Sequence, residues 1–212
     1  MRAMILVLSP KESCDLLNGN LSVLARKKFP SDYVGWVYIY CTKSQYEELW
    51  WYDGTEDFRL YKKGIANEED TGWHLQNGKV VARFWCDKVE ELERTVYGYY
   101  KTNTITWSKI EDKICLRNKD LDIYFKAENH FGKVGYAIHI TNLEIFDKPK
   151  EISKFEKLGS YLNPTIKCPK KDKGKCNLGI SPFTNQWCGC EKAKLTRAPR
   201  SGWCYIDVDE NN

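Results

Sequence analysis

The chain has 212 residues, 42% of them hydrophobic and 14% aromatic, and a formal net charge of +4. The ring content favours strands and a barrel-like core over a helical bundle, and the mild charge permits nucleic-acid binding without requiring it. The first apolar run, Met4 to Leu8, is too short for a signal-peptide core or a membrane span, and no later run is long enough either. We therefore expect a cytoplasmic protein without a membrane partner, in which the nine cysteines stay reduced.

The N-terminal part predicts two buried strands separated by a helix and a short extended segment. Ser9 can cap the helix, and Pro10 suits its first turn because the missing N–H would have no partner there. Gly19 permits the left-handed backbone that ends a helix. The predicted elements are a strand at 4–8, a helix that stops at 18–19, an extended segment at 21–26 and a central strand at 34–41.

The rest of the chain predicts further strands with short helices between them. Residues 44–76 form an irregular excursion with one hairpin, and 163–200 form an insert rich in Cys and Lys. Residues 89–95 stay unassigned, and 102–116 are either a loop or a short helix. We predict strands at 79–86, 136–146 and 202–208, and a helix at 118–125. Ile152, Phe155 and Leu158 have helical spacing and predict a further helix that ends at Gly159.

These elements give one α+β domain over residues 1–212, most simply a small closed or partly open barrel of five to six strands. A basic corner, Arg26-Lys27-Lys28, directly precedes the strand that carries Trp36 and Tyr40. Phosphates need cations and nucleobases need flat faces, so this juxtaposition points to RNA or a nucleotide as the ligand. A solvated corner with no ligand is the alternative for the three charges.

Further candidate ligand contacts lie at strand ends. Tyr40 can stack a base or belong to the core, and Thr42 and Lys43 follow it at the mouth of the strand. His139 lies on the polar side of its strand, which favours a half-buried, hydrogen-bonded histidine over a ligand contact. The closing strand adds Ser201 and Trp203, the latter either a core residue or a stacking platform.

The cysteines divide into two groups. Cys14, Cys41 and Cys86 lie on apolar faces and are expected to be buried thiols. The insert has too few aliphatic residues to fold alone, and a structural Zn²⁺ would supply the missing cross-link. Unliganded thiols are the alternative, because the usual Cys-x-x-Cys pair is missing. The four predicted zinc ligands are Cys168, Cys176, Cys188 and Cys190.

Several segments occur in the order typical of one family. Ser9-Pro10 precedes a helix ending at Asn18-Gly19, Arg26 follows, and then come VGWVYIYCTK, GKVVARFWCDKV, YAIHITNLEIFDKPKEISKF and RAPRSGWCY. This series resembles the ASCH domain family of the PUA-like superfamily, in a type found in low-GC bacteria and their phages. It covers most of the chain except about 45–75 and the insert. The resemblance implies a PUA-like β-pseudobarrel with a cleft that binds RNA or nucleotides.

The family's cleft motif is Gly-x-Lys-x-x-Glu-x-Arg, and some members are amidohydrolases acting on acetylated cytidine or ribonucleases. Gly19 and Arg26 match the motif, whereas Leu21 and Leu24 replace its lysine and its acidic residue. Leucine can neither activate water nor protonate a leaving group. Arg26, on one strand face with Ser22, would then lack that acidic partner and be free to bind phosphate.

The leading hypothesis is a non-catalytic RNA- or nucleotide-binding protein centred on Arg26, with Lys27 and Lys28 nearby. One alternative is an amidohydrolase or ribonuclease that uses residues outside the altered motif. The other is a phage-type protein that binds or sequesters a host defence protein through Trp50-Trp51-Tyr52.

Overall fold

The computed structural model describes residues 2–52, 55, 57–65, 72–157, 193–195 and 197–208. Over these residues the chain combines three β-sheets with short helices, so the predicted α+β class is confirmed. None of the helices in the described ranges has the length and apolar content needed to span a membrane.

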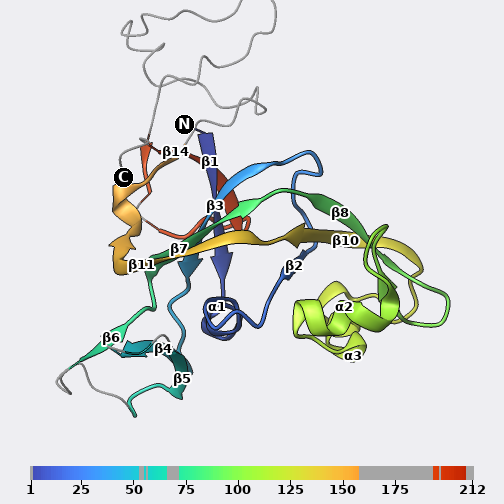
Figure 1. Ribbon diagram of the computed structural model, residues 1–212, viewed down its shortest axis with the longest axis horizontal. Coiled ribbons are helices and arrows are strands. Elements are labelled where there is room, and N and C mark those ends of the chain that lie inside the picture. Colours follow the sequence, from blue (N-terminus) through green and yellow to red (C-terminus); the bar gives the residue numbers. More distant parts are fainter. Residues whose placement is uncertain are drawn as a thin grey trace, which may run out of the picture.

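A seven-stranded mixed sheet forms the body of the molecule (Figure 1). The N-terminal strand pairs in parallel with the strand at 35–41 and antiparallel with the C-terminal strand. Residues Ala3 to Leu6 are completely buried because the sheet is covered on both faces. The strand order is β11 (Thr141–Glu151), β7 (Lys79–Cys86), β3 (Gly35–Cys41), β1 (Arg2–Leu8), β14 (Trp203–Asp207), β12 (Glu156–Lys157) and β13 (Ala193–Lys194).

A second sheet shares two long stretches of chain with the first. Its strand order is β2 (Val23–Arg26), β10 (Gly132–His139), β8 (Val89–Arg94) and β9 (Tyr100–Lys101). Strands β7 and β8 follow each other almost directly, and β10 runs into β11 with only Ile140 between them. Both stretches therefore pass between the large sheet and the small one, and they curl the molecule into a half-barrel (Figure 1). The strand predicted at 136–146 spans this junction.

The helices begin where the sequence indicates. In α1 (Pro10–Leu17), the Ser9 hydroxyl accepts a hydrogen bond from the Glu12 N–H, and the Glu12 carboxylate accepts one from the Ser9 N–H, as in a capping box. Gly19 follows with φ +73°, so the predicted stop is confirmed. Helices α2 (Trp107–Ile114) and α3 (Asn118–Phe125) cover the small sheet (Figure 1). Residues 107–114 thus resolve the loop-or-helix alternative in favour of a helix.

Alternation along β2 explains how two cores meet. Leu24 packs with α1 and the inner face of the large sheet, whereas Val23 and Ala25 pack with α2 and α3 under the small sheet. A third cluster lies on the outer face of the large sheet and includes Tyr38 and Tyr40. The aromatic residues of β3 therefore lie on the opposite face from Leu24 of β2.

The excursion is more regular than expected. It forms a three-stranded sheet of β4 (Glu47–Tyr52), β5 (Phe58–Lys62) and β6 (Trp73–Leu75) in the order β5-β4-β6. The Asn18 side chain fixes this sheet to α1, because its amide both donates to and accepts from the Phe58 backbone at 2.9 Å. Trp50 is only 2% exposed, so the aromatic surface expected at 50–52 is reduced to Tyr52 and a half-buried Trp51.

Two other expectations differ from the structure. The helix predicted from Ile152 and Phe155 is only a 3₁₀ turn, η1 (Ile152–Lys154), which leads into β12. Both residues are buried against the outer face of the large sheet, so their spacing reflects packing there and not a helical stripe. The described part also contains more strands than the five to six predicted, since β8 and the excursion add their own.

Candidate functional site

The basic corner is divided between two environments. Arg26 ends β2 and turns towards α1, where its Nη1 lies 2.9 Å from Glu12 Oε1 and 2.7 Å from the Ala25 carbonyl oxygen. The Arg26 side chain is 12% exposed. The expectation that Arg26 lacks an acidic partner is therefore wrong, because α1 supplies the carboxylate that Leu24 does not.

The Glu12 carboxylate is ionised in this pair. Burial alone would raise its pKa, but the Arg26 guanidinium and the hydrogen bonds from Ser9 bring the pKa below its usual value. Glu12 thus has two tasks, since the same carboxylate caps α1 and neutralises Arg26.

A cavity of about 60 Å³ lies beside this pair. Leu21 and Leu24 line it and are 7% and 2% exposed, respectively, so the two altered motif positions serve as core residues. A water molecule needs roughly 10–15 Å³ of such space, so the cavity holds a few waters at most and no nucleotide. Ser22, by contrast, is exposed immediately before β2 and is not among the residues lining this cavity.

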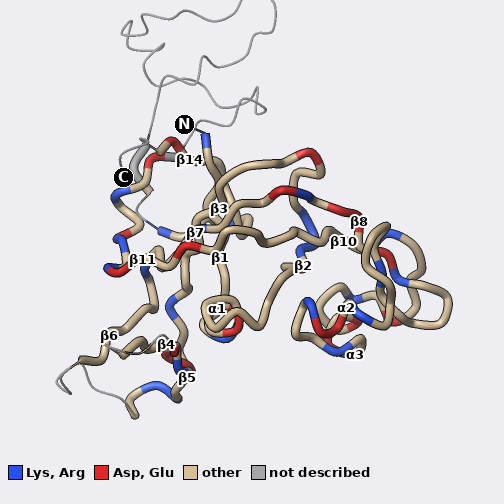
Figure 2. The backbone as a smooth tube through the Cα atoms, viewed as in Figure 1, with Lys and Arg blue, Asp and Glu red and all other residues tan. Residues whose placement is uncertain are grey.

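A larger groove lies on the other side of the corner and encloses about 480 Å³. Lys27 and Lys28 are exposed along it, and Figure 2 shows the positive charge where β2 ends. Within the described ranges neither lysine has an ion-pair partner, although the Lys27 ammonium lies 5.2 Å from the Tyr124 ring centre. The full lining is Lys27, Lys28, Phe29, Pro30, Lys133, Val134, Gly135, Tyr136 and Trp203.

The Trp203 indole is fixed against this corner. Its Nε1–H donates a 3.0 Å hydrogen bond to the Lys28 carbonyl oxygen, and its ring contacts Phe29 at 6.0 Å and Tyr205 at 5.7 Å between centroids. Ser201 donates a hydrogen bond of 2.5 Å to the Trp203 carbonyl oxygen but does not line the groove. The predicted residues Lys27, Lys28 and Trp203 are therefore brought together.

The opposite wall comes from β10 and was missed from the sequence. Lys133 lies 4.6 Å from the Tyr136 ring centre and forms an ion pair with Glu91. Gly135 lies between them, and a Cβ built there would come within 2.5 Å of the Arg26 carbonyl oxygen and of the Phe125 ring. This close approach requires glycine and brings β10 next to the basic corner. The sequence signal was the Lys-x-Gly-Tyr pattern at 133–136.

Other predicted contacts lie elsewhere. Tyr40 is 5% exposed in the core on the outer face of the large sheet, so it cannot stack a base in this groove. Thr42 and Lys43 follow β3, where the Lys43 side chain packs over Gly78. Neither residue lines the groove.

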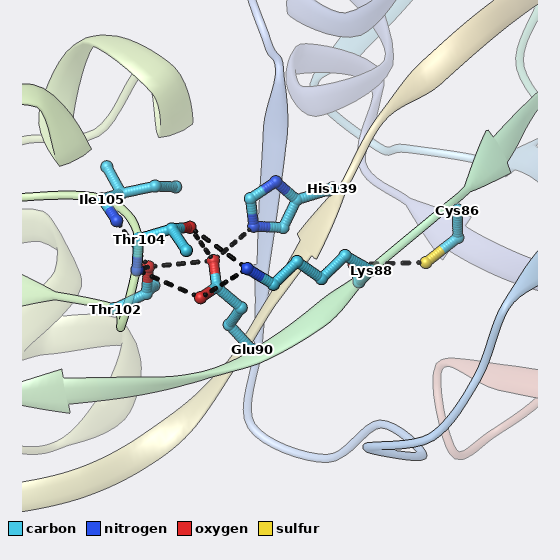
Figure 3. A network of polar contacts seen from close by, with 7 residues as sticks. All are labelled: Cys86, Lys88, Glu90, Thr102, Thr104, Ile105 and His139. Carbon is cyan, nitrogen blue, oxygen red and sulfur yellow. Dashed lines mark hydrogen bonds and ion pairs between the residues drawn. The ribbon is translucent and has the colours of Figure 1, made fainter.

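His139 belongs to a polar network around Glu90 on the face of the small sheet that carries α2 (Figure 3). The His139 Nε2 lies 2.7 Å from Glu90 Oε2, and Lys88 Nζ lies 3.1 Å from Glu90 Oε1. The hydroxyls of Thr102 and Thr104 donate hydrogen bonds to Glu90 Oε2 at 3.0 and 2.5 Å, respectively. The Thr104 N–H also donates to Glu90 Oε1 at 3.1 Å. His139 is thus the hydrogen-bonded, half-buried histidine that its strand position favours.

Glu90 is held as an anion by these donors. Its side chain is only 2% exposed, and burial alone would raise its pKa. The hydrogen bonds from Thr104, Lys88, His139 and Thr102 outweigh that effect and lower the pKa to about 2.

The described cysteines differ in burial, and Cys115 is exposed with its thiol 3.0 Å from the Asn20 carbonyl oxygen. Cys41 and Cys86 are fully buried, and burial raises the pKa of each thiol to about 12, so neither is a thiolate at neutral pH. Cys14 is only half-buried, in contrast to the buried thiol expected from its helix face. Cys168, Cys176, Cys188 and Cys190 lie outside the described residues, and within the described ones no group of three potential ligands could hold a metal ion. The zinc site stays a prediction, which metal analysis of the purified protein can test.

Comparisons with known proteins give one kind of match. Four chains of solved structures resemble this one. One is the crystal structure of ASCH from Zymomonas mobilis, with 12% identity, 71% of this chain and 73% of that chain covered, and a TM-score of 0.43. Another is a tyrosine-to-phenylalanine mutant of the same Zymomonas mobilis protein, with the same identity and TM-score and 76% of that chain covered. At this identity and TM-score the likeness carries no information on ligand or activity.

Comparisons of the sequence itself found nothing. No protein family model matches the chain, and no curated protein matches it.

Proposed function

We propose that the protein binds RNA or a nucleotide in the groove between the basic corner and β10, and that it binds this ligand without transforming it. The observation that supports this most is the pair Lys27 and Lys28. Both are exposed, neither has a carboxylate partner in the described part of the chain, and both line a groove with the Trp203 indole. Exposed ammonium groups beside an immobilised ring are complementary to phosphate and base, respectively.

The size of the groove supports the same ligand class. About 480 Å³ lies within the range of roughly 300–1,000 Å³ typical of small-molecule sites. Lys27 and Lys28 would contact phosphate oxygens, while Trp203 and Tyr136 would offer faces or edges to a base. Arg26 lies behind this wall, and its pairing with Glu12 gives it a positioning role at the end of β2.

The residues around the groove favour binding over catalysis. Its described lining contains no carboxylate and no imidazole, the groups that most often act as general acid and base. The altered motif positions Leu21 and Leu24 are buried. We propose that the chain is an ASCH-type domain of the low-GC bacterial and phage kind, on the strength of its ordered sequence segments, in which two positions of the cleft motif serve packing.

Fluorescence anisotropy with a labelled single-stranded RNA, and with labelled ATP, tests this proposal at low salt. We expect the wild-type chain to bind at least one of these probes, and the double variant Lys27→Gln/Lys28→Gln to bind it more weakly by about ten-fold or more. Lys62→Gln/Lys63→Gln is the matched control, because it removes an equal charge from an exposed lysine pair in the excursion. Equal weakening by both double variants would contradict a site at the groove.

One observation favours a second candidate, an amidohydrolase acting on acetylated cytidine or a ribonuclease. Glu90 fixes one nitrogen of His139, which is how a carboxylate orients a catalytic imidazole in known hydrolases. Against it, Glu90 accepts from five donors and lies in a separate network from the groove lining. Turnover of acetylated cytidine or RNA that disappears in His139→Ala, with folding retained, would establish this function in place of the first.

A further inference from the structure

A second large pocket lies where the end of α1, the sheet of the excursion and β11 meet. It encloses about 580 Å³, within the range of roughly 300–1,000 Å³ typical of small-molecule sites. The pocket shares no lining residue with the groove beside Lys27 and Lys28. We call it the acidic pocket, after Asp57 and Asp147, the charged residues of its lining.

Much of the acidic pocket is apolar. Phe58 is 5% exposed and belongs to the core between α1 and the large sheet, against which Leu143 also packs. Ile145 is 41% exposed beside them. Such a surface gains free energy when it covers the hydrocarbon part of a ligand. The apolar side chains of the lining, apart from Trp51, are Leu17, Phe58, Leu143, Ile145 and Phe146.

Trp51 adds an aromatic ring that is already fixed in place. Its Nε1–H donates a 2.9 Å hydrogen bond to the Thr55 carbonyl oxygen. Its ring stacks on the His74 ring, with 5.5 Å between the centroids and 28° between the planes. A ring held in this way loses little conformational entropy when a ligand binds. Indole is also the side chain whose face attracts cations most strongly.

The charge of the lining is negative. Asp57 and Asp147 are exposed, and within the described ranges neither has an ion-pair partner. Lys148 and Lys150 share β11 with Asp147, but neither lines the pocket, and the Lys150 ammonium lies 4.5 Å from the Phe146 ring centre. Helix α1 also ends here, with no basic residue in its last turn to offset the partial negative charge of its end.

These features together select one class of ligand. Phosphates and other anions would meet two carboxylates and the negative end of a helix. A metal ion does not fit either, because no group of three potential ligands occurs among the residues that the structure describes. An organic cation matches every part of the lining, since its charge can pair with the carboxylates and the indole while its body covers the apolar surface.

We propose that the acidic pocket binds a small organic cation, an ammonium or guanidinium group carried on an apolar or aromatic body. The site is separate from the groove beside Lys27 and Lys28 and takes a ligand of the opposite charge. It therefore does not depend on the binding of RNA or a nucleotide.

Isothermal titration calorimetry of the full chain in low-salt buffer tests the proposal with three probes of similar size and shape. Phenethylamine is a cation at neutral pH, 2-phenylethanol is neutral and 3-phenylpropionate is an anion. We expect phenethylamine to bind with a dissociation constant in the millimolar range or below, as suits a small ligand. The alcohol should bind about ten-fold more weakly or worse, and the carboxylate should not bind, because both lose the attraction to Asp57 and Asp147.

Two variants locate the site. Asp57→Asn/Asp147→Asn should weaken phenethylamine binding by about ten-fold or more, whereas Asp32→Asn/Asp87→Asn, which removes two exposed carboxylates elsewhere, should leave it unchanged. Ile145→Lys should also abolish binding, because it places a fixed ammonium group in the pocket. Its matched control is Ile123→Lys, since Ile123 is 69% exposed on α3 and lies outside the pocket.

An absence of phenethylamine binding up to about 10 mM would overturn the proposal. Equal affinity for the amine and the alcohol would do the same, because the charge would then have no role. Binding that Asp57→Asn/Asp147→Asn leaves intact, or that the control variants weaken as much, would also contradict a site in this pocket. Circular dichroism checks that each variant is folded, which is expected because the substituted side chains are exposed.

Discussion

Arg26 has a different role in the structure from the one that the sequence suggests. In the sequence, Leu24 stands two residues before Arg26 at the position where the ASCH motif has an acidic residue. This suggests that Arg26 is an unpaired cation. In the fold, Glu12 reaches it from a position fourteen residues upstream. Glu12 already has a role as the capping residue of α1, so nothing in the sequence indicates its second contact.

This pairing predicts that Arg26→Ala affects stability more than ligand binding. The variant leaves the Glu12 carboxylate without its cation, and we expect the free energy of unfolding at neutral pH to fall by about 1 kcal/mol, a modest figure because Glu12 is 37% exposed. Urea denaturation followed by circular dichroism measures the change.

The same effect should depend on pH in one direction. The folded-state pKa of Glu12 lies below its usual value, so the pair stabilises the fold above the unfolded-state pKa, and this contribution disappears as the pH falls through the folded-state value. The difference in the free energy of unfolding between wild type and Arg26→Ala should therefore become smaller below about pH 4. A difference that grows on acidification would contradict the pairing.

Trp203 carries a separate prediction for the groove. Its ring offers a stacking face, and its Nε1–H fixes the Lys28 backbone. We expect Trp203→Ala to weaken RNA binding by about ten-fold or more, since base stacking on one ring is worth about 1–3 kcal/mol. Trp203→Phe should have a smaller effect because a ring remains. If both Trp203→Ala and Trp203→Phe bind RNA with wild-type affinity in the anisotropy assay, Trp203 does not belong to the site.

At the scale of elements, the Glu90 network holds the segment that leads into α2. Glu90 on β8 binds Thr102 and Thr104, and the Thr102 hydroxyl accepts a 2.9 Å hydrogen bond from the Ile105 N–H (Figure 3). His139 connects the same carboxylate to β10. One buried anion thus joins two neighbouring strands to the start of a helix.

Glu90→Gln should destabilise the protein and flatten its acid response. The Glu90 pKa is about 2 in the folded protein and about 4.3 in the unfolded chain, a difference that corresponds to about 3 kcal/mol of folding free energy above about pH 4.3. This contribution disappears as the pH falls towards 2. We expect wild type to lose stability over this range more steeply than Glu90→Gln. Parallel curves from urea denaturation between about pH 5 and 2.5 would contradict this role.

The elements that sequence patterns predict correctly are those with local signals. Strand β1, helix α1 with its Ser9 cap, and helix α3 lie where they are expected. The sequence leaves strand β8 unassigned because its inward residue Glu90 is charged and is accommodated only by distant donors. The excursion looks irregular in the sequence because its strands depend on pairing across the chain and on Asn18 of α1.

At the scale of the whole molecule, the site depends on topology. The two sheets share long strands, and this places the end of β2, the start of β10 and the start of β14 side by side. Lys28 and Trp203 are 175 residues apart in the chain and joined by a hydrogen bond. The sequence identifies the basic corner correctly as a cationic feature, but it assigns the neighbouring rings to β3. Those rings lie across the large sheet, and only three-dimensional pairing reveals Tyr136 and Trp203 as the actual neighbours.

The salt dependence of RNA binding tests the central claim most directly. For a single strand, each phosphate contact contributes about 0.7 to the slope of log affinity against log salt concentration. We predict that wild-type protein binds RNA at low salt and that its affinity falls as salt is added. Lys27→Gln/Lys28→Gln should reduce the magnitude of this slope by about 1.4, because two phosphate contacts are lost. Lys62→Gln/Lys63→Gln should leave the slope unchanged. No binding of RNA or nucleotide at low salt, or the same slope in wild type and the Lys27/Lys28 variant, would contradict a phosphate-binding groove at this corner.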